Sequence, residues 1–253
     1  MRQKDDSGFI DLLNNVRVGE LNSNDESMIR SRLITRGHPD YPIDSLHLFA
    51  ENASVHLHNI QRLDTLPSET INVEAMDVYP RDFTESQITK VKNLPLNDTG
   101  GLSVLFDLKI GARVMLISNI DIEDRLINGQ LGTVTDIKFR NNKAELIYFP
   151  LKLAYACTVH KVQGLTLDSV VVSFDLARQR QFNAGQMYVA MSRVKNLNGL
   201  YFTGQYRRSA FVCSDKVSEE YTRLRQNKVE RVADIMRCSS NLNVCKIFKT
   251  TCS

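Results

Sequence analysis

The strongest constraint on the fold of this chain lies in the stretch YACTVHKVQGLTLDSVVVSFD. A helix is expected over residues 153–163, and Gly164 follows it as a residue that readily closes a helix in the left-handed conformation. The apolar run over residues 169–174 then has the length and β-branched content of a buried strand. A second helix over 184–195 and a second strand over 200–203 repeat the order. This alternation predicts an α/β fold.

The first hundred residues continue the alternation. Apolar residues at helical spacing, followed by Gly19, predict an opening helix, and Ser23 and Glu26 stand in the capping-box spacing that begins a second one. A strand is expected over residues 46–50 and a helix over 53–63. ETINVEAMDVYP predicts another strand, and residues 80–100 predict a helix followed by a linker that ends at NDTGG. The apolar residues of the opening helix are Phe9, Leu12, Leu13 and Val16.

From Leu108 the pattern changes to short strands. LKIGARVMLISNID, QLGTVTDIKF and KAELIYF are three strand candidates, with turns at Asn128–Gly129 and Asn141–Asn142. Short strands and tight turns over about 45 residues predict a small β-barrel. Because the α/β pattern returns after Pro150, we interpret the barrel as an insertion in one α/β domain. The expected parts are residues 1–104, the barrel over 105–150, the rest of the α/β domain over 151–206, and a charged helix and tail over 207–253.

Composition excludes several classes of protein. Apolar residues make up 42% of the 253 residues, so a substantial core is expected, and a net charge of +3 does not by itself indicate a nucleic-acid binder. No run of about 18 apolar residues exists, so no membrane association is expected. The N-terminus lacks an apolar signal core and the five cysteines form no Cys-x-x-Cys pair, which predicts an intracellular protein with reduced thiols. Cys238, Cys245 and Cys252 repeat every seven residues, which is not a zinc spacing, and we expect no metal site.

Several nucleotide and hydrolase motifs are missing. The chain has no G-x-x-x-x-G-K-[ST], which would cradle phosphates and bind magnesium through its Ser/Thr. It has neither the G-x-G-x-x-G of dinucleotide sites nor the G-x-S-x-G elbow of serine hydrolases. We expect that these 253 residues alone cannot bind and hydrolyse a nucleotide.

The first candidate site is GQMYVAMSRVKN. Gln186 and Arg193 are seven residues apart, so on a helix they would share one flank of an apolar stripe. An arginine held there at the edge of a cleft suits a phosphate, because guanidinium offers a fixed two-pronged donor. The alternative is an arginine paired with a surface carboxylate.

The second candidate is the segment around His160, Lys161 and Gln163. In open α/β sheets, ligands bind at the loops that flank strand ends, and these side chains could contact a phosphate or a base there. The alternative is a solvated helix end. The third candidate is Asn52, which stands where a strand gives way to a helix and free N–H groups favour an anion. Its alternative is a plain helix N-cap.

Together these stretches resemble one family. LKIGARVMLISNID…RLINGQLGTV, FPLKLAYACTVHKVQGLTLD and GQMYVAMSRVKNLNGLYFTG stand in the order and spacing of the C-terminal half of PIF-type (petite integration frequency) DNA helicases. These helicases form part of the RecD-like branch of superfamily one, and the helitron-transposon helicases are close relatives. The opening MRQKDDSGFIDLLNNVRVGE also resembles the segment that follows the family's first RecA-like domain, so the resemblance covers about residues 1 to 225.

The resemblance implies a second RecA-like domain with an inserted SH3-like barrel. The family uses ATP and Mg²⁺ to move 5′ to 3′ along single-stranded DNA and to unwind duplexes. ATP lies between two RecA-like domains, of which the first, absent from this sequence, supplies the P-loop and the acidic metal-binding pair. Arg2 and Arg193 correspond to the arginines that face the terminal phosphate, where such a group contributes about 10³–10⁵ in rate. Gln186 and Gly164 are assigned to the same nucleotide.

The resemblance also implies a DNA-binding surface. The family's motif that contacts DNA and relays closure of the ATP cleft is similar to the segment around Gly164, and Asn52 matches an asparagine near its backbone contacts. Phosphate contacts dominate such binding, so it should weaken steeply with salt. Two departures weaken this surface: Val162 replaces the serine of HKSQG, and Glu51 replaces a threonine before Asn52. The other residues assigned to DNA are Thr158, His160, Lys161 and Gln163.

The sequence therefore predicts the C-terminal motor half of a DNA helicase, acting on single strands and duplex junctions in the nucleus or mitochondrion. Alone it is expected neither to hydrolyse ATP nor to unwind DNA. One alternative is a non-catalytic nucleic-acid-binding remnant of a helicase or helitron. Another is an interaction protein that uses only the barrel. The sequence leaves the oligomeric state open.

Overall fold

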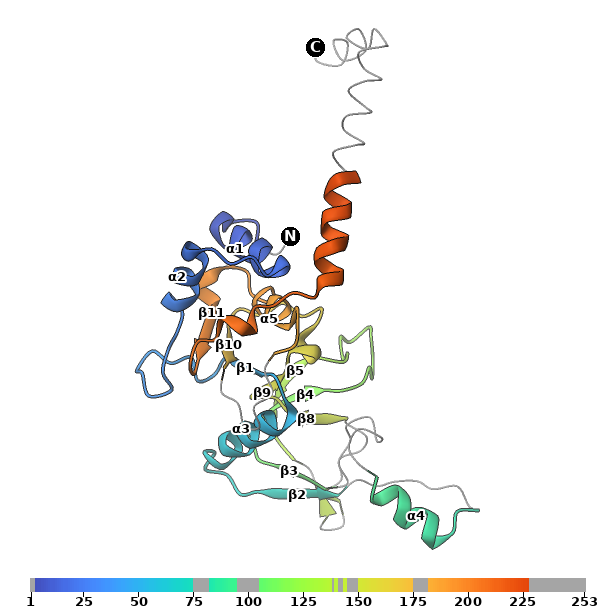
Figure 1. Cartoon of the computed structure of the whole chain (residues 1–253). Coiled ribbons are helices and arrows are strands. Elements are labelled where there is room, and N and C mark those ends of the chain that lie inside the picture. Colours follow the sequence, from blue (N-terminus) through green and yellow to red (C-terminus); the bar gives the residue numbers. More distant parts are fainter. Residues whose placement is uncertain are drawn as a thin grey trace, which may run out of the picture.

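A parallel β-sheet forms the centre of the molecule (Figure 1). The computed structural model describes residues 3–74, 82–94, 105–137, 139–140, 143–144, 150–174 and 182–227. The sheet has the strand order β11-β10-β1-β9, and each neighbouring pair is parallel. The predicted α/β class is thereby confirmed. The strands span Leu46–Phe49 (β1), Ala156–Thr158 (β9), Val170–Ser173 (β10) and Leu200–Thr203 (β11).

The carboxyl ends of these strands lie along one edge of the sheet. Phe49 of β1 is opposite Thr158 of β9, and Ser173 of β10 is opposite Thr203 of β11. The chain over residues 32–34 extends the sheet beyond β11, because the Phe202 N–H donates to the Arg32 carbonyl at 2.9 Å and the Ile34 N–H donates to the Phe202 carbonyl at 2.8 Å. Ligands of open parallel sheets bind at this type of edge, so it is the first place to examine for a site.

Helices α1 and α2 cover the sheet near the N-terminus. In α1 (Ser7–Val18), the four apolar residues predicted to face the core are buried, and Gly19 closes the helix at φ 77°. Helix α2 (Ser23–Ser31) also forms, but its capping box pairs Asn22 with Asp25, one residue earlier than predicted. The helices described elsewhere span Asn52–Asp64 (α3), Glu85–Lys92 (α4), Gln186–Met191 (α5) and residues 215–227, with short 3-10 helices at Val159–Val162 (η1), Leu197–Gly199 (η2) and Arg208–Ala210 (η3).

The main core lies between the sheet, α1 and α5. Met187, Ala190 and Met191 of α5 are almost fully buried, as their helical spacing predicted. Phe174 and Phe202 stack with ring centroids 5.4 Å apart. Burial of a large aromatic side chain contributes several kcal/mol, so this cluster anchors the sheet near β11.

A second, smaller core lies around α3's C-terminal end and the antiparallel strands (Figure 1). Its buried residues include Leu63, Val73 and Leu108. Gly129, in the predicted turn, has φ 93° and donates its N–H to the Leu116 carbonyl at 2.9 Å. The other predicted turn, Asn141–Asn142, lies outside the described residues. The strands form the pairs β2 (Ile71–Glu74) with β3 (Leu105–Leu108), β4 (Arg113–Leu116) with both β5 (Leu131–Thr133) and β8 (Leu151–Leu153), and β6 (Phe139–Arg140) with β7 (Lys143–Ala144).

Two helix predictions were wrong. Residues 153–163 contain the last residue of β8, the whole of β9 and then η1. Ala154 to Cys157 are buried consecutively, as in a buried strand, and show no exposed helical face. The helix expected over 184–195 is only the six-residue α5, whose C-cap is Ser192. Arg193 therefore follows the helix instead of lying on it.

A buried polar cluster lies between β1 and α3. The Nδ1 of His47 faces the Ser45 carbonyl at 2.9 Å and must donate to it, so its Nε2 accepts from the Tyr41 hydroxyl at 2.7 Å. The His58 ring lies 4.3 Å from the His47 ring, centroid to centroid, and its Nε2 has no hydrogen-bond partner among the described residues. Burial lowers the pKa of His47 to about 3 and that of His58 to about 4. Both rings are therefore neutral at physiological pH.

The described residues were also compared with the requirements of a membrane span and of a metal site. Within the described ranges, no helix is both long enough and apolar enough to span a bilayer. In the same part of the chain, no three His, Cys, Asp or Glu side chains gather as metal ligands would. The cysteine series of the tail lies outside the described residues.

Candidate functional site

Asn52 and Thr158 come from adjacent strands at the carboxyl edge. Thr158 is the last residue of β9 and is paired with Phe49, and Asn52 begins α3 three residues after Phe49. Asn52 is exposed and is the first residue of the helix, so the N-cap alternative was wrong: the N-cap is Glu51, whose side chain makes no capping bond. Instead, Glu51 accepts a hydrogen bond from Ser54 Oγ at 3.2 Å.

The segment after Thr158 exposes the polar side chains that the sequence singled out. Lys161 and Gln163 are exposed, and Gly164 has φ 89° with open space where a Cβ would stand. His160 Nε2 lies 2.8 Å from Gln186 Nε2. An amide nitrogen can only donate, so His160 Nε2 is the acceptor of this hydrogen bond.

Gln186 is buried at the N-terminus of α5 and uses both ends of its amide. Its Oε1 accepts the Asn183 N–H at 2.8 Å while its nitrogen donates to His160. The glutamine therefore links the start of α5 to the turn that follows β9.

Arg193 lies behind this surface and is only 9% exposed. Its Nε donates to the Val189 carbonyl at 2.8 Å, its Nη2 to Ser192 Oγ at 2.7 Å, and its Nη1 to the Val162 carbonyl at 3.4 Å. The guanidinium is therefore held inside its own domain, which differs from the predicted position on a helix flank at the cleft edge. To meet a ligand phosphate, the side chain would have to exchange these carbonyls for the ligand.

The two predicted motifs are thus in direct contact. His160–Gln186 joins them at one point and Val162–Arg193 joins them at another, and the Leu167 N–H donates to the Arg193 carbonyl at 2.9 Å. Asn52 belongs to the neighbouring part of the edge. Arg2 lies outside the described residues.

Sequence reasoning missed two buried amides that hold this region together. Asn59 accepts the Ala156 N–H at 2.8 Å and donates to the Ala156 carbonyl at 3.1 Å, which fixes β9 to α3. Gln3 donates to the carbonyls of Ser192 and Val194. Asn59 could have been suspected as a polar residue on the inner face of a predicted helix, but no pattern marked Gln3.

Cys157, the residue before Thr158, is not a reactive group. Burial raises the pKa of its thiol to about 12, and the charges of Lys152 and Lys161 offset this only in part. Burial also lowers the pKa of Lys152. The thiol stays protonated and packs as a small apolar side chain.

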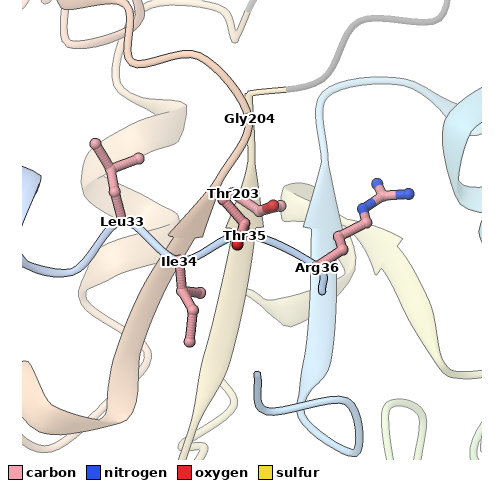
Figure 2. Close-up of a pocket in the computed structure, with 6 residues that line it drawn as sticks. All are labelled: Leu33, Ile34, Thr35, Arg36, Thr203 and Gly204. Carbon is pink, nitrogen blue, oxygen red and sulfur yellow. The ribbon is translucent and has the colours of Figure 1, made fainter. Parts of the chain in front are cut away.

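Two pockets lie away from His160 and Arg193, and the second includes Gly185 and Tyr188 of the first candidate stretch. The first, of about 370 Å³, lies at the carboxyl end of β11, where the chain from Leu33 to Arg36 crosses the sheet and the Arg36 side chain extends past β1 (Figure 2). The second, also about 370 Å³, lies between α1, α5 and helix 215–227. There the Arg17 guanidinium stands 4.7 Å from the Tyr188 ring centroid and 5.7 Å from that of Tyr221.

Comparison of the sequence with known proteins points to one family. Residues 91–137 match the family model described as DNA helicase Pif1, 2B domain. ATP-dependent DNA helicase PIF1 of Xenopus laevis is 31% identical over 79% of this chain and 34% of its own length, and that of Homo sapiens is 31% identical over 88% and 37%. This chain therefore spans about a third of the length of these relatives.

Solved structures give the same result. The crystal structure of Pif1 helicase from Candida albicans superposes with a TM-score of 0.70 at 28% identity, covering 90% of this chain and 59% of that one. Bacteroides sp Pif1 in complex with ADP-AlF4 superposes with a TM-score of 0.58 at 22% identity, covering 88% and 55%, which supports the fold alone.

The fold defines an α/β protein in which the two candidate motifs contact each other beside the carboxyl edge of a parallel sheet. The resemblance to PIF-type superfamily-one helicases is confirmed, and the chain is a relative of these enzymes.

Proposed function

We propose that this chain is the C-terminal motor half of an ATP-dependent 5′-to-3′ DNA helicase. In this proposal the parallel-sheet region belongs to a second RecA-like domain, and residues 105–150, which contain β3 to β7, are its inserted SH3-like barrel. The barrel strands β3 and β4 also pair with β2 and β8, which flank it in the sequence. One observation carries the proposal: the segments TVHKVQG and YVAMSR, distant in sequence, are hydrogen-bonded to each other next to the carboxyl edge of the sheet. A motor domain needs such a contact, because it must relate DNA binding to the state of the nucleotide.

The nucleotide side of the proposal uses the arginines. Arg193, together with Arg2, would donate to the terminal phosphate of ATP bound by a P-loop domain, with Gln186 and Gly164 nearby. Mg²⁺ would neutralise phosphate charge, and it would be held by that other domain, which fits the lack of a carboxylate cluster in the described ranges. The relatives from Xenopus laevis and Homo sapiens are named ATP-dependent DNA helicases, which supports ATP as the nucleotide. In this chain, Ser192 and the Val162 and Val189 carbonyls hold the arginine until then.

The DNA side of the proposal uses the exposed edge. Lys161 supplies charge for a DNA phosphate, and Asn52, Thr158, His160 and Gln163 supply hydrogen-bonding groups from two adjacent strands. Relatives from Bacteroides were crystallised with single-stranded DNA, and a structure of two Pif1 helicases concerns unwinding at forked duplex DNA. A shift of the turn that follows β9 would reach α5 through the His160–Gln186 bond.

The DNA surface can be tested on the 253-residue chain. We expect an oligo-dT strand to bind, with an affinity that falls steeply as salt rises, because phosphate contacts release counterions. Replacing Lys161 with Gln should weaken binding and reduce the salt slope by about 1, measured by fluorescence anisotropy at several salt concentrations. The control is Lys92→Gln on α4, an exposed lysine away from the edge, which should leave the slope unchanged. Equal slopes for the wild-type chain and Lys161→Gln would contradict the assigned surface.

The ATPase can also be tested on the chain alone. Because its sequence contains no P-loop, we expect no ATP hydrolysis above background and no unwinding, with or without single-stranded DNA. Phosphate release from Mg²⁺-ATP measures this directly. DNA-stimulated ATP hydrolysis by the purified 253-residue chain would refute the proposal that a separate domain supplies the P-loop.

A second candidate function is a non-catalytic nucleic-acid-binding remnant of a helicase or helitron. An in-frame P-loop sequence encoded upstream of Met1 supports the motor, whereas an authentic translation start at Met1 supports the remnant. A third hypothesis is an interaction protein that uses only the barrel. Under this hypothesis, no single-stranded DNA should bind in the anisotropy experiment. We place the motor in the nucleus or mitochondrion, by analogy with the family.

A further inference from the structure

A buried glutamine at the N-terminal end of the described chain contacts the segment that contains Arg193. Gln3 is 6% exposed, and its Nε2 donates to the Val194 carbonyl at 2.7 Å and to the Ser192 carbonyl at 3.2 Å. These two carbonyls belong to the residues on either side of Arg193. One side-chain amide therefore holds the backbone of the arginine from both sides.

A second contact fastens the same two segments. Asp6 Oδ2 accepts the Leu197 N–H at 3.0 Å, while its Oδ1 accepts the Phe9 N–H at 3.0 Å and begins α1. The turn over residues 3–6 is thus attached to residues 192–197 at two points. A single hydrogen bond would leave the segment free to rotate, whereas two points separated along the chain fix its orientation.

The side chain of Arg193 depends on this backbone. Its Nη2 donates to the hydroxyl of Ser192, whose carbonyl accepts from Gln3, and Ser192 Oγ in turn donates to the Val189 carbonyl at 3.1 Å. Rotating the backbone at Ser192 would move both the hydroxyl and the start of the arginine side chain. Gln3 therefore contacts the backbone from which the arginine side chain starts, without touching the guanidinium itself.

We infer that Gln3 is the positioning residue for Arg193, and that the segment entering this domain sets the direction in which the arginine points. The purpose of this positioning rests on the proposed function, because an arginine that must meet a phosphate requires a fixed starting geometry. It assigns to Gln3 a role in orienting a reactive group, in addition to any effect on stability. The amide is suited to this role, since its nitrogen carries two N–H donors and can satisfy two carbonyls at once.

The test uses the 253-residue chain and the NMR signal of the Arg193 Nε–H, which is assigned as the signal that disappears in Arg193→Lys. In the wild-type chain this proton should exchange slowly with water, because the Nε donates to Val189 inside the protein. Gln3→Met keeps the length of the side chain but removes both N–H donors. We expect its Arg193 signal to shift and its proton to exchange about tenfold faster, the factor that corresponds to loss of one net hydrogen bond.

Controls separate positioning from stability. Lys4→Met changes the exposed neighbour of Gln3 and should leave the signal unchanged. Val73→Ala removes packing in the second core, so it should lower the melting temperature without moving the Arg193 signal. If Gln3→Met does not fold, Gln3→Asn keeps an amide on a shorter side chain and should shift the signal in the same direction.

The outcomes distinguish this inference from the proposed function. An unchanged Arg193 signal in a folded Gln3→Met or Gln3→Asn protein overturns the positioning role, whether or not stability falls. That result would leave the DNA-binding and ATPase experiments untouched. Conversely, the Arg193 signal could shift in Gln3→Met while the wild-type chain binds no single-stranded DNA. That result would support the role of Gln3 in orienting the arginine and contradict the proposed helicase function.

Discussion

Acidification from pH 7.5 to 4.5 is expected to lower the free energy of unfolding on the order of 3–5 kcal/mol through two buried histidines. His47 and His58 have folded-state pKa values of about 3 and about 4, below the value of 6.5 for a solvated histidine. Between pH 6.5 and about 4, the unfolded chain therefore binds protons that the folded chain excludes. Each histidine then removes about 1.4 kcal/mol per pH unit as the pH falls.

The cause of this low proton affinity is the environment of the two rings. Burial is the largest contribution for both, and for His47 the neighbouring His58 is next. The positive charges of Arg36 and Arg62 oppose protonation of both rings further. Among the groups packed against the rings, Tyr41 and Ser45 contribute neutral hydrogen-bonding groups.

The matched variants are His58→Phe and His56→Gln. Phenylalanine fits between the rings of His47 and Phe49 and removes a buried nitrogen without a partner, so His58→Phe should keep its stability at pH 7.5 and lose less than wild type at pH 4.5. His56 is exposed on the same helix, and its replacement should leave the pH dependence unchanged. Urea unfolding followed by circular dichroism at one-unit pH steps measures the slopes. Parallel curves for His58→Phe and wild type would show that His58 does not titrate as described.

The second large effect is expected from Gly199→Ala, which should destabilise the chain by about 3 kcal/mol or more. A Cβ at Gly199 would stand 2.3 Å from the backbone carbonyl oxygen of Asp168, a distance that real Cβ atoms do not show. Gly199 directly precedes β11 and Asp168 precedes β10 by two residues. The clash must therefore push apart the starts of two adjacent central strands, and neither backbone can move aside as a flexible side chain would.

Thermal unfolding gives the comparison. For a chain of this size, about 3 kcal/mol corresponds to a fall of roughly 10 °C in Tm. Gly37→Ala is the control, because nothing lies within 4 Å of its added Cβ, and it should change the Tm little. If Gly199→Ala melts within about 2 °C of wild type, the close approach of the two strand starts does not exist in solution.

The α/β class and most elements near the main core could be predicted because their signals are local. The spacing of Phe9, Leu12, Leu13 and Val16 and the stop at Gly19 depend only on neighbouring residues, and the structure confirms both. Residues 153–163 were misassigned because a short apolar run fits a buried strand and a buried helix equally well. The deciding partners, His47 of β1 and Asn59 of α3, lie about a hundred residues away and leave no trace in the local pattern.

The sequence singled out the candidate residues, but it could not predict how they lie relative to one another. His160 and Gln186 were singled out separately, and the structure joins them by a hydrogen bond that neither segment could reveal. Arg193 was expected on a helix flank, but α5 ends at Met191 and the arginine turns inward to backbone carbonyls. Gln3 was not predicted, because no local pattern marks a single polar residue whose hydrogen-bond partners, Ser192 and Val194, are distant in the sequence.

The central position of β1 has a consequence for how this protein is made. Both strands that pair with β1 are encoded on the order of 100 residues later, so the ribosome releases β1 well before either of them. During that interval the open backbone groups of β1 have no native strand partner. Slowing translation before residue 156 should therefore change the yield of folded protein more than slowing it after residue 203. A chaperone that binds extended segments should change the yield most when translation is slowed before residue 156.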